Sequence, residues 1–353
     1  MSPKDGAAEI LREYDSRRAK GLFLILGGLA LTLVLAVWFT ALGAIDTGWS
    51  DILHTLRAAA AGQELDTGQK VILHLRLPRV TMAILAGAGL SVSGAAMQGI
   101  TRNPLVSPFT IGVSNAAAFG ATLSIVFGVG LFPGTQAGTV LMAFLTAFLC
   151  AALVYLVSLR VGLSPQTLVL TGIAVNYLFS AATSLIQYFA DEHRLAAAVA
   201  WAFGSFNGVE WSEVSVSAVV VAASCALLYR YAPALDLLSS GDDEVARSLG
   251  ADPNRVRVAT GALSVLATAA IISFTGVIGF LGLAGPHIAR MLLGGSHRRL
   301  LPFSAVVGAL LALIADTIGR MILAPVMLPV GIVVSFLGVP IFVNLILSQR
   351  KGA

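Results

Sequence analysis

The chain has 353 residues, of which 57% are hydrophobic and only 11% charged, with a mean hydropathy of +0.88. An ordinary soluble domain has about a quarter of its residues charged, so this composition excludes a soluble globule and predicts an all-α, polytopic membrane protein. The net charge of +4 comes from basic residues scattered at the ends of apolar segments, which excludes a nucleic-acid-binding surface.

Apolar segments follow an N-terminal tail, residues 1–20, and predict one transmembrane domain over residues 21–350. A helix that crosses a bilayer needs about 20 predominantly apolar residues. The first segment is longer than the core of a signal peptide and is predicted to be an uncleaved span. The segments of suitable length are 21–42, 77–100, 109–130, 140–159, 167–189, 214–231, 258–281, 302–323 and 328–347.

A tenth crossing is predicted at residues 284–294, which are too few for a regular spanning helix. Glycines recur every third residue from Gly276 to Gly285, and Pro286 follows them. This pattern predicts a broken or tightly packed turn that is buried in protein, because lipid does not tolerate unpaired backbone groups. About ten transmembrane helices place both termini on the same side of the membrane.

Basic residues select that side. Fifteen of the 22 lysines and arginines fall on one side of the predicted topology and six on the other, with Arg290 unassigned. The positive-inside rule therefore places both termini in the cytoplasm. Arg76, Arg79 and Arg320 lie on the opposite, outer side, where they are either functional or anchors at helix ends.

Two connections are longer than a simple turn. The outer loop, residues 43–74, is predicted to hold a short amphipathic helix around residues 49–60. The inner loop, residues 232–254, is polar and charged, and Pro233, Gly241, Gly250 and Pro253 divide it into two short helical pieces. Because a passive connector needs fewer residues, we expect the inner loop to dock onto another protein.

No catalytic, metal or cofactor site is predicted. The five histidines are dispersed, Cys150 and Cys225 lie in apolar runs as expected of buried thiols, and no P-loop motif is present. Uphill transport would therefore draw on a partner or on an ion gradient. Asp316 lies four residues before Arg320, a spacing that suits either an ion pair within one helix or a proton relay.

Several stretches occur in a fixed order from Leu75 to the C-terminal region: LRLPR, SGAAMQGITRNPLVSPFTIGVSNAAAFGA, SGDDEVARSLGAD, GVIGFLGLAGPHIARMLLGGSHRRLLP, LIADTIGR and LPVGIVVSFLGVPIFVNLIL. They resemble the FecCD family, the permease subunits of type II ABC importers for iron–siderophores, haem and cobalamin. The resemblance implies ten helices and a permease homodimer in the cell inner membrane, with the pathway at its interface and contacts to membrane lipid. It also implies two copies of an ABC ATPase subunit inside and a periplasmic or lipid-anchored substrate-binding protein outside.

The resemblance assigns roles to three groups of residues. In a cobalamin permease of this family, arginines at positions matching Arg76, Arg79 and Arg320 pair with glutamates of the binding protein; headgroup anchoring is the alternative. The inner loop resembles an ATPase-coupling loop, with a solvated hairpin as the alternative; its residues are Gly241, Glu244, Ala246, Arg247, Leu249 and Gly250. Two turns match cytoplasmic gate segments, the first of which could equally be a plain tight turn: Asn103, Pro104 and Leu105, and Ser164, Pro165 and Gln166.

The sequence therefore predicts a non-enzymatic permease subunit that moves an iron chelate, with a siderophore preferred over haem or cobalamin. The second gate segment departs from the small hydroxyl residues of the cobalamin permease, which leaves the gate and the cargo open. Two alternatives remain: an ion-gradient-coupled secondary transporter that uses Asp316 and Arg320, and a membrane-embedded enzyme or scaffold.

Overall fold

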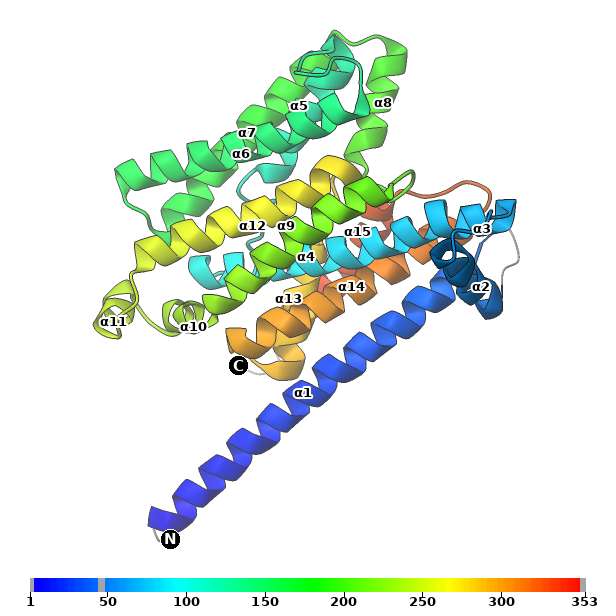
Figure 1. Ribbon diagram of the computed structural model, residues 1–353. Coiled ribbons are helices and arrows are strands. Elements are labelled where there is room, and N and C mark those ends of the chain that lie inside the picture. The colour runs from blue at the N-terminus through cyan, green and yellow to red at the C-terminus, as the bar shows by residue number, and fades with distance from the viewer. Residues whose placement is uncertain (1–2, 44–47, 350–353) are drawn as a thin grey trace.

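The computed structural model describes the backbone of residues 3–43 and 48–349, and the side chains of residues 19–43 and 48–340. Within these ranges every regular element is helical, as the fold-class prediction requires (Figure 1). The elements are α1 (Pro3–Ala41), α2 (Trp49–Ala60), α3 (Thr67–Val71), the π-helical η1 (Ile72–Arg76), α4 (Leu77–Thr101), α5 (Val113–Phe127), α6 (Gln136–Val161), α7 (Pro165–Tyr188), α8 (Glu192–Ala202), α9 (Trp211–Arg230), α10 (Ala232–Ser240), α11 (Asp243–Ser248), α12 (Pro253–Thr275), α13 (Leu281–Leu293), α14 (His297–Met321) and α15 (Val330–Gln349).

All ten predicted crossings appear as helices. Among the described residues, seven helices are long and apolar enough to cross a membrane, whereas α5, α13 and the described part of α15 are shorter. The predicted range 109–130 was too long for α5, because Gly112 takes φ +94° and forms the N-cap of a helix that begins only at Val113. The short α13 contains Pro286 and follows a non-helical stretch, as the glycine spacing indicated.

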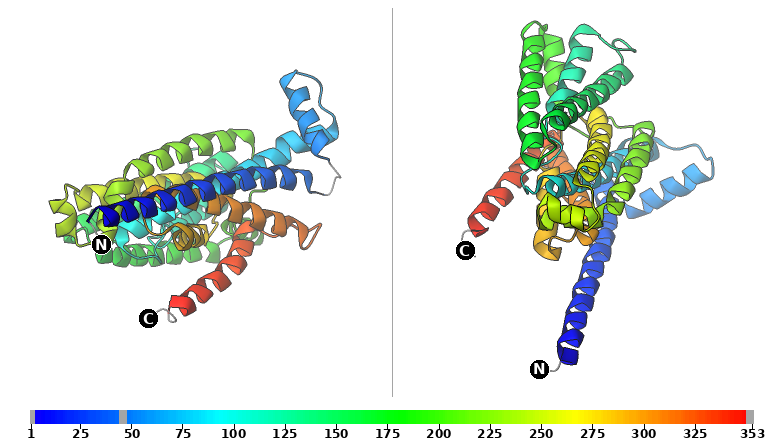
Figure 2. Two further views of the ribbon diagram at one scale, coloured as in Figure 1. Left: turned by 90° about the horizontal axis from the view of Figure 1, so that it is seen from below. Right: turned by 90° about the vertical axis from the view of Figure 1, so that its left-hand side faces the viewer.

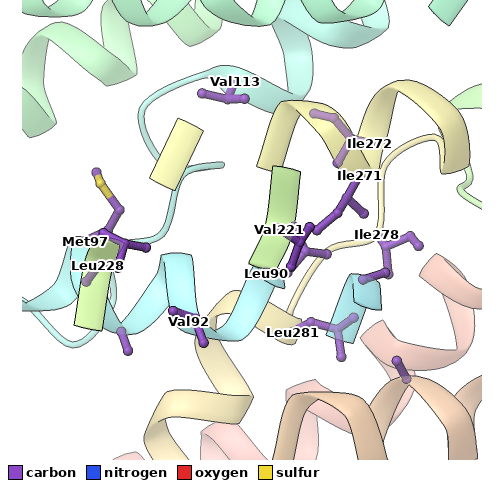
Figure 3. Packing of buried hydrophobic residues seen from close by; sticks show 14 of the residues in the cluster. Leu90, Val92, Met97, Val113, Val221, Leu228, Ile271, Ile272, Ile278 and Leu281 are labelled. Carbon is purple, nitrogen blue, oxygen red and sulfur yellow. The ribbon is translucent and has the colours of Figure 1, made fainter. Parts of the chain in front are cut away.

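The central helix of the bundle is α4, which packs against α9, α12, α13 and α14. Its small residues allow other backbones to come close: a Cβ atom on Gly87 would overlap the carbonyl group of Gly308 in α14, and one on Gly94 would overlap that of Gly282 in α13. Larger side chains fill the remaining space, and Figure 3 shows Leu90 beside Val221 of α9. Close helix approach through small residues is the usual way in which membrane helices associate.

The peripheral helices flank this core on two sides. Helices α5 to α8 form one group, and α1 runs along the opposite side against α14 (Figure 1). Helix α1 begins at Pro3, within the predicted tail, and continues to Ala41. The predicted end of the domain at residue 350 lies outside the described residues. The eleven-residue α8 was not predicted; it begins where the Asp191 carboxylate accepts a hydrogen bond from the Arg194 backbone.

The short helices mark the two ends of the bundle. Helices α2 and α3 lie at one end, and α10 and α11 lie at the other (Figures 1 and 2). We call these the α2–α3 end and the α10–α11 end. The predicted helix at residues 49–60 is confirmed as α2, and the two predicted helical pieces of the inner loop are confirmed as α10 and α11.

Candidate functional site

A buried ion-pair cluster joins α4 to α14 at the α2–α3 end. Arg79 Nη2 lies 2.8 Å from Asp316 Oδ1, and Arg79 Nε donates to the same oxygen at 3.0 Å. Arg320 Nε lies 3.3 Å from Asp316 Oδ2, one helical turn away. The side chains of Arg79 and Asp316 are only 9% and 3% exposed. One carboxylate therefore serves two guanidinium groups in a largely dry environment.

Arg76 lies beside this cluster because of the local helix geometry. Pro78 lacks the N–H group that would continue a regular ladder, and the preceding turn is π-helical, with the Leu77 N–H bonded to the Ile72 carbonyl. The Arg76 side chain reaches back to α1 and donates to the carbonyl groups of Thr40 and Ala41 at 3.1 Å. The structure thus brings all three predicted docking arginines to one end of the bundle.

A cavity of about 480 Å³ opens beside these arginines. Its wall combines cationic and amide groups with apolar side chains. Arg79 Nη1 lies 3.4 Å from Asn207 Oδ1 at its edge. The lining residues include Leu75, Arg76, Arg79, Asn207, Arg320 and Met327. An anionic or carboxylate-bearing group of suitable size would find donors there.

The Asp316–Arg320 contact matches the first of the two interpretations of this spacing, an ion pair within one helix. The stronger partner, Arg79, was not predicted, because it lies 237 positions away in the chain. The buried Asp316 carboxylate is thus paired with two arginines of the same chain.

At the α10–α11 end, α11 is a short helix with a defined stop. It ends in a Schellman motif, in which Gly250 N–H donates to the Arg247 carbonyl and Ala251 N–H donates to the Ala246 carbonyl. Gly250 takes φ +88°, a conformation that favours glycine. Ala246 is fully buried, whereas Glu244, Val245, Arg247 and Leu249 are exposed. Of the predicted coupling residues, Ala246 therefore packs against the bundle, whereas Glu244, Arg247 and Leu249 are accessible to another protein.

Replacing Gly250 with alanine is expected to lower the free energy of unfolding by about 1–2 kcal/mol, since the left-handed conformation brings Cβ against the following carbonyl oxygen. Gly241→Ala is the matched control, because Gly241 has extended backbone and its Cβ would meet only ordinary contacts. Thermal unfolding in detergent compares the two variants. Equal midpoints would contradict the requirement for glycine at position 250.

Two arginines hold α11 against the bundle through Asp243. Arg257 Nη1 and Nη2 donate to the two carboxylate oxygens of Asp243 at 2.6 and 2.8 Å. Arg102 Nη2 donates to Oδ1 at 2.6 Å. The hydrogen bond from Arg257 and the positive charges nearby lower the pKa of Asp243, although partial burial opposes them. This cluster was not predicted from the sequence, because Arg102 lies 141 positions before Asp243 and Arg257 lies 14 positions after it.

The preceding short helix, α10, is fastened to α14 by a second carboxylate. Asp236 Oδ1 accepts from the His297 backbone N–H at 2.6 Å and lies 2.7 Å from His297 Nδ1. Asp236 Oδ2 accepts from the Ser296 hydroxyl at 3.1 Å. Asp236 therefore binds the first turn of α14, where unpaired backbone donors favour an anion.

The two predicted gate segments are both turns at this same end. In the first, Asn103 Oδ1 accepts from the Leu105 backbone N–H at 2.9 Å, and Leu105 is 51% exposed. In the second, the Ser164 hydroxyl caps α7 by accepting from the Thr167 backbone N–H at 3.1 Å. Pro165 then takes the first helical position, and Gln166 is exposed. Both predicted gate segments are therefore turns at the end of the bundle that carries α11.

The described residues contain no group of three or more histidine, cysteine or acidic side chains that could hold a metal ion. Cys150 is buried and Cys225 is partly buried.

Comparison with known proteins gives a consistent result. The FecCD transport family matches residues 29–348. The iron(3+)-hydroxamate import system permease of Bacillus subtilis is 37% identical, over 96% of this chain and 87% of that protein. The molybdate import system permease of Haemophilus influenzae is 38% identical, over 93% of this chain and 96% of that protein.

A solved structure agrees with these relatives. It is an ABC transporter assigned to the metal-chelate type in an inward-facing conformation, with a TM-score of 0.81 and 34% identity over 92% of this chain and 98% of that chain. Sequence and fold therefore point to the same class along nearly the whole chain. The protein is the permease subunit of an ABC importer and belongs to the FecCD transport family.

Proposed function

We propose that this permease moves an iron chelate, of which a siderophore is the first candidate, inward across the cell inner membrane. The observation that supports this cargo class most directly is the fold similarity to a transporter assigned to the metal-chelate type, together with the relative named for iron(3+)-hydroxamate. Two copies of the chain form a homodimer around the pathway. Two ATPase subunits supply the energy, and a periplasmic or lipid-anchored binding protein delivers the cargo.

The α10–α11 end faces the cytoplasm in this proposal, and both termini lie on that side. The excess of basic residues at this end supports the orientation. The exposed face of α11, formed by Glu244, Val245, Arg247 and Leu249, contacts an ATPase subunit. Gly241 and Gly250 flank this coupling helix on either side, and the buried Ala246 packs it against the bundle.

The cavity at the α2–α3 end receives acidic side chains of the binding protein. Arg76, Arg79 and Arg320 border it, and Asp316 balances only one of the two arginines that it contacts. The planar guanidinium group suits bidentate bonds to a carboxylate. Such pairs would steer the encounter and fix the orientation of the docked protein.

Changing Arg320 to glutamine is expected to weaken binding-protein affinity about tenfold or more, equivalent to about 1.4 kcal/mol. Arg194→Gln is the control, because Arg194 is 57% exposed and pairs with its own helix neighbour. Affinity is measured by surface binding to the reconstituted complex at two salt concentrations, with unfolding midpoints recorded for both variants. Unchanged affinity in a folded Arg320 variant would remove the docking role.

The two gate segments close the pathway on the cytoplasmic side. Leu105 presents an exposed apolar side chain from a turn fixed by Asn103 and Pro104, which suits a plug. The turn at Ser164, Pro165 and Gln166 stands at the start of α7 and forms the second constriction.

The cargo is tested by growth and by transport. A strain that lacks the gene is grown on single iron or cobalt sources: a hydroxamate siderophore, ferric citrate, haem or cobalamin, with molybdate as a further arm. Failure on the siderophore alone supports the proposal, whereas a defect confined to another source would replace the cargo. If the purified chain alone accumulates cargo in vesicles on a proton or sodium gradient, the ion-coupled alternative is correct.

A further inference from the structure

We infer that Arg257, with Asp243 and Arg102, mechanically connects the helix α11 to both gate segments, so that movement of α11 is transmitted to them. This inference rests on the proposed function, in which α11 contacts an ATPase subunit and the two turns form the gate. It assigns a positioning role to three residues to which the sequence analysis gave no function.

The guanidinium group of Arg257 connects three parts of the chain. Its Nη1 and Nη2 atoms hold Asp243 of α11. Its Nε donates to the carbonyl of Ile100 at 3.3 Å, three residues before Asn103, and Nη1 also donates to the carbonyl of Leu163 at 3.1 Å, directly before Ser164. A single planar group therefore bridges the coupling helix and the roots of both turns.

Burial makes this bridge stiff. The Arg257 side chain is 0% exposed, although Asp243 is 29% exposed. A buried cation that loses its carboxylate is strongly destabilised, since water cannot replace the partner. A displacement of α11 therefore draws Arg257 along with it instead of breaking the pair. The Ile100 carbonyl lies near the negative end of the α4 dipole, which adds to the attraction for the guanidinium.

Arg102 provides a second connection to the first turn. It is the C-cap of α4 and takes φ +52°, an uncommon conformation for a residue with a side chain. Its Nε donates to the Leu238 carbonyl of α10 at 2.6 Å, and its Nη2 donates to Asp243. Asn103 follows directly in the chain, so the first gate turn is tied to both short helices.

The alternative is that these residues only stabilise the fold, and it predicts a different result. A purely structural link would change the unfolding midpoint but leave the number of cargo molecules moved per ATP unchanged in the surviving complex. If the link transmits movement, breaking it would lower the number of cargo molecules moved per ATP. The coupling ratio is therefore the measurement that separates the alternatives.

The test uses the complete complex, with ATPase subunits and binding protein, reconstituted in proteoliposomes. Uptake of a ferric hydroxamate and hydrolysis of ATP are measured in the same vesicles. Asp243→Asn keeps the size of the side chain but removes its charge, and Arg257→Lys keeps the charge but loses the planar fork. Both variants are expected to keep ATP hydrolysis within about twofold and to lose at least about tenfold in cargo moved per ATP. Asp242→Asn and Arg255→Lys are the matched controls, because both neighbours are exposed to solvent.

A second readout follows the gate directly. In a chain that also carries Cys150→Ala and Cys225→Ala, the variant Leu105→Cys is labelled with a maleimide in the presence and absence of ATP. The ATP-dependent change in labelling rate is expected to disappear in Asp243→Asn and to persist in Asp242→Asn. If Arg257→Lys does not assemble, the Asp243 variant decides, since its side chain is partly exposed.

Two results would overturn the inference. Equal coupling ratios and equal labelling changes in Asp243→Asn and Asp242→Asn would show that the cluster transmits nothing, while leaving the proposed function intact. Absence of ATP-driven uptake by the wild-type complex for every cargo would overturn the proposed function and the inference with it. The two failures are therefore distinguishable in one set of vesicles.

Discussion

Asp316→Ala is expected to lower the free energy of unfolding by about 3–5 kcal/mol, the usual cost of removing one partner of a buried ion pair. The variant leaves Arg79 and Arg320 facing each other, with side chains only 9% and 11% exposed. Their repulsion and the loss of the bidentate bond both act on the contact between α4 and α14. The unfolding midpoint in detergent is the measurement.

Two further variants are compared with Asp316→Ala. Glu192→Ala removes an exposed carboxylate and is expected to change the free energy of unfolding by no more than about 0.5 kcal/mol. The double variant Arg79→Met with Asp316→Leu replaces one buried pair by apolar groups and is expected to recover only part of the loss, because Arg320 still lacks the Asp316 carboxylate. If Asp316→Ala unfolds at the wild-type midpoint, the cluster contributes no stability.

Gly94→Val is expected to cost about 3 kcal/mol or to prevent folding, since overpacking of a tight contact is destabilising. Even a Cβ atom at this position would overlap the Gly282 carbonyl group, which belongs to the backbone of α13 and cannot rotate away. The two helices would have to separate, and the hydrogen bond from Ser91 to the Leu281 carbonyl at 2.8 Å would be lost with them.

Gly27→Val is the matched control for this effect. Gly27 lies in the apolar part of α1, and a Cβ atom there would meet nothing within 4 Å. The yield of folded protein and the unfolding midpoint are compared for both variants. Normal folding of the Gly94 variant would contradict the close approach of α4 and α13.

The positions of the spanning helices could be predicted because the length of an apolar run is a local property of the sequence. The arrangement of these helices in the bundle could not be predicted in this way. Helices α4 and α7 are similarly apolar, yet the most apolar window of α4 is 78% buried in the chain and that of α7 only 17%. Helix α8 was missed because eleven residues, several of them alanine, carry no length signal. The start of α5 was misplaced because the conformation of Gly112 depends on its contacts with α7.

The candidate site shows the same division between local and distant information. The Asp316–Arg320 pair followed from a spacing of four residues on one helix, whereas Arg79 reaches Asp316 only after the chain has folded. Arg257 stands near the start of an apolar helix and resembles a membrane-edge anchor in the sequence. Its partners come from three other parts of the chain, so nothing near it revealed its role.

The length of α1 has a geometric consequence for assembly. Its 39 residues extend over about 58 Å, nearly twice the roughly 30 Å hydrocarbon core of a bilayer. Its first turns project from the bundle on the side of α10 and α11 (Figures 1 and 2). A large protein that approaches α10 and α11 therefore meets the projecting turns of α1 at one side. These turns limit the directions from which that protein can reach α11.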